Sequence, residues 1–162
     1  VSVGGGRESQ VGRRERIEGD VWTIPAEAMK GRKGATRDFR VPLSTEAQRV
    51  IAEAHKFARD GFLFPSAKRG VISDMTMTAY MNRRGMKERP HGFRTSLRVW
   101  LAEATSAPHD VAEMCISHIV GSKTVQAYKR TDFLEQRGAL MERWSSQSTL
   151  GIDAVKTVSH LS

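Results

Sequence analysis

The sequence predicts a mostly helical α+β fold with a small antiparallel sheet near the N-terminus. Two short stretches, residues 21–24 (VWTI) and 38–43 (DFRVPL), combine β-branched and aromatic residues as strands do. The polar, glycine-containing residues 31–37 between them are typical of a hairpin loop. From residue 44 onward, apolar residues recur at helical spacing instead. Because strands and helices are segregated along the chain, α+β is favoured over a doubly wound parallel sheet.

The first helix is predicted to begin at Ser44 and to end at Gly61. Thr45 and Gln48 have the spacing of a capping box at its start. The residues that recur at helical spacing and should form its inner face are Ala47, Val50, Ile51, Ala54, Phe57 and Ala58.

A second helix is predicted to begin at Ser73 and Asp74, whose short polar side chains favour an N-cap. Met77, Tyr80 and Met81 follow at the spacing of an inner face. We therefore expect Tyr80 to be a core residue.

More helices are predicted after Pro90, which separates the second helix from the next one. Gly121 breaks the chain again, and Ser122 should cap a short helix that carries Tyr128. The residues expected to face inward before that break are Phe93, Leu97, Trp100, Leu101 and Ala104, followed by Val111, Met114 and Cys115.

The last helix is predicted to start with a capping box formed by Asp132 and Glu135 and to run through Trp144. We expect one domain over residues 1–147 and a polar, mixed C-terminal tail over residues 148–162. The chain starts without an initiator methionine, and we expect it to be an N-terminally truncated piece of a longer protein.

The chain is strongly basic. It has 26 Lys and Arg against 18 Asp and Glu, which gives a net charge of +8. This balance favours a polyanionic partner, and nucleic acid comes first. A single cysteine excludes an internal disulfide, and no set of residues has the spacing of a zinc site. No apolar run could span a bilayer and there is no signal peptide, so we expect a cytoplasmic protein without a membrane partner.

Residues suited to phosphoryl transfer are concentrated between positions 91 and 130. His91 and Arg94 are three residues apart, so they share a face of a helix. His118 and Tyr128 follow, ten residues apart, across a Gly-Ser-Lys break. Arginine binds two phosphate oxygens and stays charged, histidine moves protons, and a phenol is a nucleophile. A phosphodiester is therefore the favoured substrate.

Five blocks of the sequence resemble phage-type integrases of the tyrosine recombinase family. Three of them, HGFR (91–94), ISHIVG (116–121) and AYKR (127–130), are similar to the family's catalytic motifs in order and separation. VWTIPAEAMKG (21–31) and RVPLS (40–44) are similar to its β-hairpin region. The resemblance implies the tyrosine-recombinase catalytic-domain fold, in which a short β-meander lies on one side of a helical domain.

The resemblance also implies a role for each matching residue. Tyr128 would attack a DNA phosphodiester, form a 3′-phosphotyrosine link and free a 5′-hydroxyl. Arg94 would bind the non-bridging oxygens. His91 would be nearer to the role of base, and His118 would donate to the phosphate. No metal or other cofactor is implied.

Two upstream roles are implied by weaker similarities. RESQV (7–11) is similar to the family block that carries a second arginine, which makes Arg7 the partner of Arg94, although Gln10 replaces the acidic residue. The family's general acid for the leaving oxygen is a lysine of the β-hairpin. Lys30 is the first candidate for that role and Lys33 is the alternative.

The other basic residues are expected to neutralise DNA phosphates. The first group of expected DNA contacts is Arg32, Lys33, Arg37, Arg40, Arg69, Lys129 and Arg130, and the other basic loop residues are Lys68, Arg83, Arg84, Lys87 and Arg89. The resemblance implies double-stranded attachment sites as the partner, a homo-tetramer on DNA and a monomer or weak oligomer without DNA, with the tail exchanged between protomers. It also implies a bacterial protein that is nucleoid-associated when bound to DNA.

Three functions remain open at this stage. The first is site-specific recombination by cleavage and rejoining. The second is DNA binding without cleavage, which applies if this piece of the protein does not assemble the active site alone. The third is DNA relaxation of the type IB topoisomerase kind.

Overall fold

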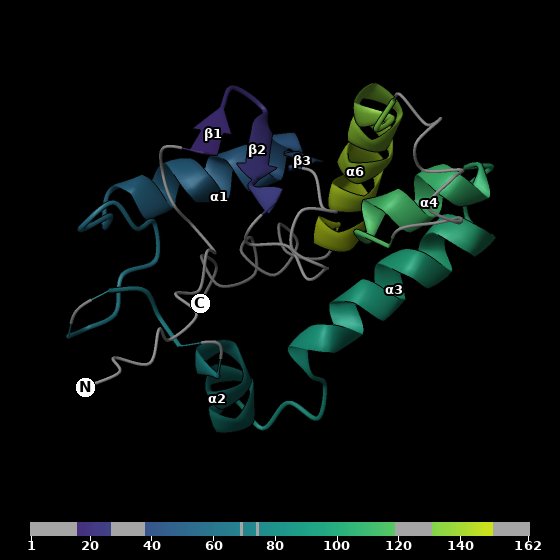
Figure 1. The fold of residues 1–162 in the computed structure, drawn as a ribbon. Coiled ribbons are helices and arrows are strands. Elements are labelled where there is room, and N and C mark those ends of the chain that lie inside the picture. The colour runs from purple at the N-terminus through teal and green to yellow at the C-terminus, as the bar shows by residue number, and fades with distance from the viewer. Residues whose placement is uncertain (1–15, 27–37, 69, 74, 119–130, 151–162) are drawn as a thin grey trace, which may run out of the picture.

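The computed structural model describes residues 16–26, 38–68, 70–73, 75–118 and 131–150. Within them it shows a three-stranded sheet followed by helices, and the predicted α+β class is confirmed (Figure 1). The elements are β1 (Ile17–Glu18), β2 (Val21–Ile24), β3 (Phe39–Pro42), α1 (Thr45–His55), α2 (Thr76–Arg83), α3 (Pro90–Glu103), α4 (His109–Cys115) and α6 (Leu134–Thr149).

The sheet is antiparallel, in the order β1-β2-β3. The predicted pairing of residues 21–24 with the following strand is confirmed, with Trp22 opposite Val41. Strand β1 is an addition that the sequence did not predict. It pairs only two residues with β2, too few for an alternating pattern, and a tight turn containing Gly19 (φ +58°) connects the two strands.

Helix α1 begins where predicted but is capped differently. The hydroxyl of Ser44 accepts the Ala47 N–H at 3.3 Å, so Ser44 is the cap, and the side chain of Gln48 donates to the Leu43 carbonyl instead of closing a capping box. The predicted box is therefore wrong, although Ser44 has the expected N-cap chemistry.

The predicted end of this helix at Gly61 is also wrong, because α1 ends at His55. Asp60 and Gly61 both have positive φ (53° and 77°), and Arg59 and Phe62 exchange backbone hydrogen bonds across them. The chain thus makes a small hairpin turn where the helix was expected to continue.

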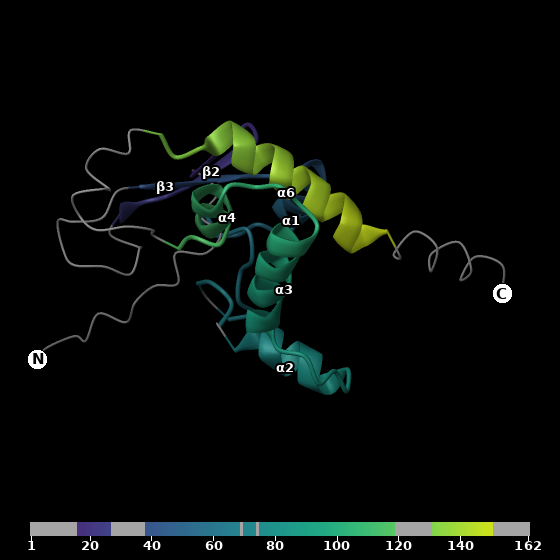
Figure 2. The ribbon, with the colours of Figure 1, turned by 90° about the vertical axis from the view of Figure 1, so that its right-hand side faces the viewer.

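Helix α2 is an eight-residue helix at the edge of the molecule (Figures 1 and 2). Of its expected inner face, only Met81 is buried, at 3% exposure, whereas Met77 and Tyr80 are 53% and 45% exposed. The expectation that Tyr80 is a core residue is therefore wrong. The Arg84 guanidinium lies 5.3 Å from the centre of the Tyr80 ring.

The core lies where α3, α4 and α6 meet. Figure 2 shows α6 running along one side, with α3 leading from it towards α2. The rings of Trp100 and Trp144 join α3 to α6 with centroids 5.4 Å apart. Phe93, which was expected to face inward, is 62% exposed because it lies at the end of α3 away from this core. The buried cluster consists of Leu97, Leu101, Val111, Ala112 and Leu140.

The expected capping box at the start of α6 is wrong. The N-cap is Phe133, in a left-handed conformation (φ 52°), and no side chain caps it. The carboxylate of Asp132 instead accepts two hydrogen bonds from the Arg40 guanidinium, both at 2.8 Å. The Asp132 side chain therefore binds Arg40, which is distant in sequence, and does not form the capping box predicted with Glu135.

A buried arginine fastens the sheet to α6. Arg137 is 1% exposed and donates to the backbone carbonyls of Asp132 (2.9 Å) and Arg40 (2.6 Å). Its guanidinium also lies 5.0 Å from the centre of the Phe39 ring. These contacts hold β3 against the start of α6. None of the described helices is both long enough and apolar enough to cross a membrane.

Candidate functional site

The described residues contain part of the predicted catalytic set, namely His91, Arg94 and His118. The nucleophile candidate Tyr128 lies outside them, so its predicted helix and role stay predictions. The other predicted site residues outside the described part are Arg7, Lys30, Arg32, Lys33, Arg37, Arg69, Lys129 and Arg130.

The site is built on the C-terminal turn of α4. The His118 N–H donates to the Glu113 carbonyl at 2.9 Å, and the Ser117 N–H donates to the Met114 carbonyl at 3.0 Å. Ser117 between them is left-handed, with φ of 55°. These three features define a Schellman motif, the common way in which a helix ends. The motif turns His118 back towards the last turn of α4.

Arg94 reaches the same turn from α3. Its Nη1 donates a hydrogen bond to the carbonyl of Ile116, two residues before His118. The side chain remains exposed while it makes this contact. The structure therefore brings Arg94 and His118 together, although the α3–α4 connection separates them in the sequence.

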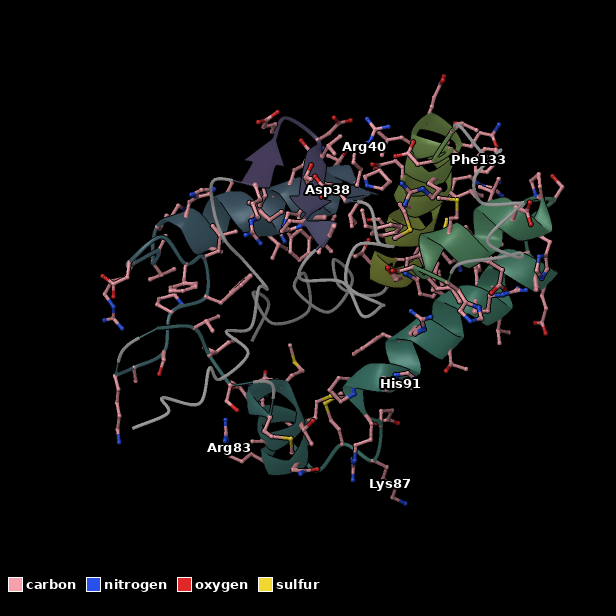
Figure 3. The ribbon with its side chains drawn as sticks, in the orientation of Figure 1. Asp38, Arg40, Arg83, Lys87, His91 and Phe133 are labelled. Atoms are coloured by element: carbon pink, nitrogen blue, oxygen red, sulfur yellow. The ribbon has the colours of Figure 1, made fainter. Side chains whose placement is uncertain are left out.

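His91 lies at the start of α3, one helical turn before Arg94 (Figure 3). Its spacing from Arg94 places both on one side of the helix. Among the described interactions, no hydrogen bond or ion pair joins His91 to Arg94 or to His118. Of the two α3 residues, Arg94 is thus the one with a described contact to this turn.

The buried carboxylate of Glu113 connects side chains of the site. Glu113 is 7% exposed, and its two oxygens have different partners. Oε2 lies 2.5 Å from Nδ1 of His118, and Oε1 accepts a hydrogen bond from Nε of Arg98 at 2.6 Å. Nε2 of His109 lies 3.9 Å from Oε1. The hydrogen bond from His118 lowers the pKa of Glu113 against the effect of burial, and Arg98 lowers it further.

Neither Glu113 nor Arg98 is among the residues that the sequence predicts for the site. A signal was present, since Glu113 is an acid inside the otherwise apolar run VAEMCI. An acid at such a position is buried only when it has partners. Which partners it has is decided by the packing of α3 against α4, because Arg98 comes from α3.

The arrangement offers an anion a positive guanidinium and an anchored imidazole on one turn. Arginine and histidine side chains with fixed positions can hold a phosphate and stabilise charge that develops on it. The described residues contain no group of three or more His, Cys, Asp or Glu that could hold a metal ion. Cys115, beside the turn, is half-buried, and burial raises the pKa of its thiol.

Arg40 is the one residue of the first group of expected DNA contacts that the structure describes. Its side chain is 50% exposed and forms the ion pair with Asp132. Figure 3 shows Arg40 beside the start of α6, whereas His91, Arg83 and Lys87 lie around the end of α2 and the start of α3. The basic side chains are thus spread over more than one region.

Comparison with known proteins gives a family. The chain is 32% identical over 147 residues to the prophage integrase IntA of Escherichia coli strain K12, and the match covers 87% of this chain. The chain belongs to the phage integrase family of tyrosine recombinases. The matching region is 34% of IntA, so the chain spans about a third of the length of this relative. No protein-family model matches the chain, and no solved structure matches it significantly.

Proposed function

We propose that this integrase chain carries out site-specific DNA recombination, cutting and rejoining attachment sites through a 3′-phosphotyrosine intermediate. The observation that supports the proposal most directly is the convergence of Arg94 and His118 on the C-terminal turn of α4. A net charge of +8 suits a DNA partner. The name of the relative IntA, a prophage integrase, agrees with a role in DNA integration.

The reaction proposed here is a phosphoryl transfer in two steps. The phenolic oxygen of Tyr128 forms a bond to phosphorus, the bond from phosphorus to the 5′-oxygen breaks, and Lys30 or Lys33 gives that oxygen a proton. His91 takes the phenolic proton. In the second step a 5′-hydroxyl attacks phosphorus, the bond from phosphorus to the Tyr128 oxygen breaks, and the phosphodiester is restored. Lys30 or Lys33 takes the proton of the 5′-hydroxyl, and His91 returns its proton to the phenol. The bond energy is kept in the protein–DNA link.

Positive charge is the main contribution that the protein makes to this reaction. The transition state places added negative charge on the non-bridging oxygens, and Arg94, Arg7 and His118 would offset it. Attachment-site DNA as the partner, and a tetramer of protomers assembled on it, belong to the same proposal.

The test uses a suicide attachment-site substrate that traps the covalent intermediate, with the chain in its full-length parent protein. We expect the unmodified protein to form a protein–DNA adduct and Tyr128→Phe to form none. Tyr80→Phe is the matched control, because the sequence has two tyrosines and Tyr80 is 45% exposed. An adduct in Tyr128→Phe would overturn the choice of nucleophile.

A second candidate function is DNA binding without cleavage. It is favoured by the short span of the chain, which covers about a third of IntA. Salt-dependent binding to a cognate site with no adduct would support it. Relaxation of a supercoiled plasmid without a cognate site would instead indicate a topoisomerase-like activity.

A further inference from the structure

The carboxylate of Glu113 has no role in the reaction proposed above, yet it is the most enclosed ionisable group of the site. Its side chain is 10% exposed, whereas the side chains around it are 31% (Arg98), 67% (His109) and 65% (His118) exposed. Buried carboxylates are costly unless they are paired and hydrogen-bonded. The burial of the Glu113 carboxylate against His118 therefore needs a physical explanation.

The geometry determines which nitrogen of His118 carries a proton. An ionised carboxylate only accepts hydrogen bonds, so Nδ1, at 2.5 Å from Oε2, must be the donor. The lowered pKa of Glu113 keeps it ionised at neutral pH. Nε2 is then the ring nitrogen left for another partner, on a side chain that is 65% exposed. It donates when the ring carries both protons and accepts when the ring is neutral.

The backbone supports the same orientation. Glu113 and His118 are also joined by the hydrogen bond from the His118 N–H to the Glu113 carbonyl. In a Schellman motif these two positions often make an apolar contact. Here the carboxylate and the imidazole occupy those positions and are bonded twice, once through the backbone and once through the side chains.

We infer that Glu113 is a positioning residue that fixes the ring of His118 with the proton on Nδ1 and Nε2 turned outward, towards the DNA phosphate. This inference rests on the proposed function for the role of His118. Arg98 holds the other carboxylate oxygen and so prevents Glu113 from rotating away. Glu113 acts through His118 and does not itself touch the DNA.

The first test is the tautomer of His118, measured by two-bond ¹H–¹⁵N correlation NMR on the 162-residue chain at a pH where the ring is neutral. We expect the unmodified chain to carry the proton on Nδ1. In Glu113→Gln, the amide oxygen should face Arg98, which only donates, so the amide NH₂ faces the ring. Nδ1 must then accept, and the proton should move to Nε2.

Glu53→Gln is the matched control, since Glu53 also carries an ion pair but lies exposed on α1. It should leave the His118 tautomer unchanged. A neutral His118 with its proton on Nε2 in the unmodified chain would overturn the inference, whether or not Glu113→Gln folds.

The second test is the rate of adduct formation in the parent protein. Partners that orient a functional side chain typically contribute 10- to 100-fold, so Glu113→Gln should lower the rate by about that factor while DNA affinity stays within about twofold. In a His118→Ala background, the same substitution should lower the rate no further. Losses that multiply in the double variant would show that Glu113 does not act through His118.

The two proposals fail in different ways. If the unmodified protein forms no adduct on a cognate site, the recombinase reaction is wrong, and the NMR result still decides whether Glu113 fixes the His118 ring. If the adduct forms and the tautomer does not depend on Glu113, only the inference about Glu113 is wrong.

Discussion

Ser117 adopts a left-handed backbone conformation at the residue where α4 ends. Non-glycine residues there cost roughly 1–2 kcal/mol, which glycine avoids. The conformation is nevertheless needed, because it lets the His118 N–H reach the Glu113 carbonyl. At the scale of single residues, the orientation of the imidazole thus depends on the backbone conformation of the residue before it.

We therefore predict that Ser117→Gly raises the free energy of unfolding by about 0.5–1 kcal/mol, measured by urea denaturation. Ser146→Gly is the control, since Ser146 lies inside α6 with right-handed helical geometry. That substitution should lower stability by about 1 kcal/mol. The strain argument would be contradicted if both variants shifted stability in the same direction.

At the scale of elements, the sheet is connected to the helices through the start of α6. Arg137 bonds the carbonyls of Asp132 and Arg40, and the Arg40–Asp132 ion pair lies over it. Further along α6, the Glu142 carboxylate accepts the N–H of Thr45 at 2.8 Å, which ties the first turn of α1 to the same helix. Helix α6 thereby holds β3 and α1, which precede the site in the sequence.

Arg137→Leu should lower the free energy of unfolding by about 2–4 kcal/mol, because the carbonyls of Asp132 and Arg40 lose the donor of their part-buried hydrogen bonds. Arg143→Leu on the same helix is the control. Arg143 is exposed and only lies over the Trp100 ring at 5.8 Å, so its loss should cost about 1 kcal/mol or less. Equal losses in thermal or urea unfolding would show that the burial of Arg137 does not matter.

At the scale of the whole molecule, the net charge of +8 predicts that DNA binding weakens steeply with salt. Arg83 and Lys87 extend from the end of α2 and the loop after it (Figure 3). Each residue that contacts a phosphate should reduce the slope of log affinity against log salt by about 1 when it is replaced by Gln.

Arg40→Gln should behave differently from Arg83→Gln and Lys87→Gln. Its charge is already paired with Asp132, so it should lower stability and change the salt slope by less. Titrations of attachment-site DNA at several salt concentrations check this. Equal slopes for all variants would mean that the ion pair opens when DNA binds.

The sequence alone determined the α+β class, the β2–β3 hairpin and the separate helix after Pro90, because these depend on short-range patterns of side chains and breakers. From motif order and spacing it also predicted His91, Arg94 and His118 as candidate site residues, but not Glu113 and Arg98. Where a local pattern met no distant competitor, as at Ser44, the predicted N-terminus was correct.

Tertiary structure decided which of these side chains are available. Asp132 could have capped α6, but Arg40 from the sheet binds it. Tyr80 could have been buried, but on α2 it stays 45% exposed, and of the predicted inner face only Met81 is covered. Only the packing of α3 against α4 placed Arg98 on Oε1 of Glu113, whereas the local turn at the end of α4 placed His118 on Oε2. The Arg98–Glu113 and Arg40–Asp132 pairs join different elements, and local spacing holds no information about them.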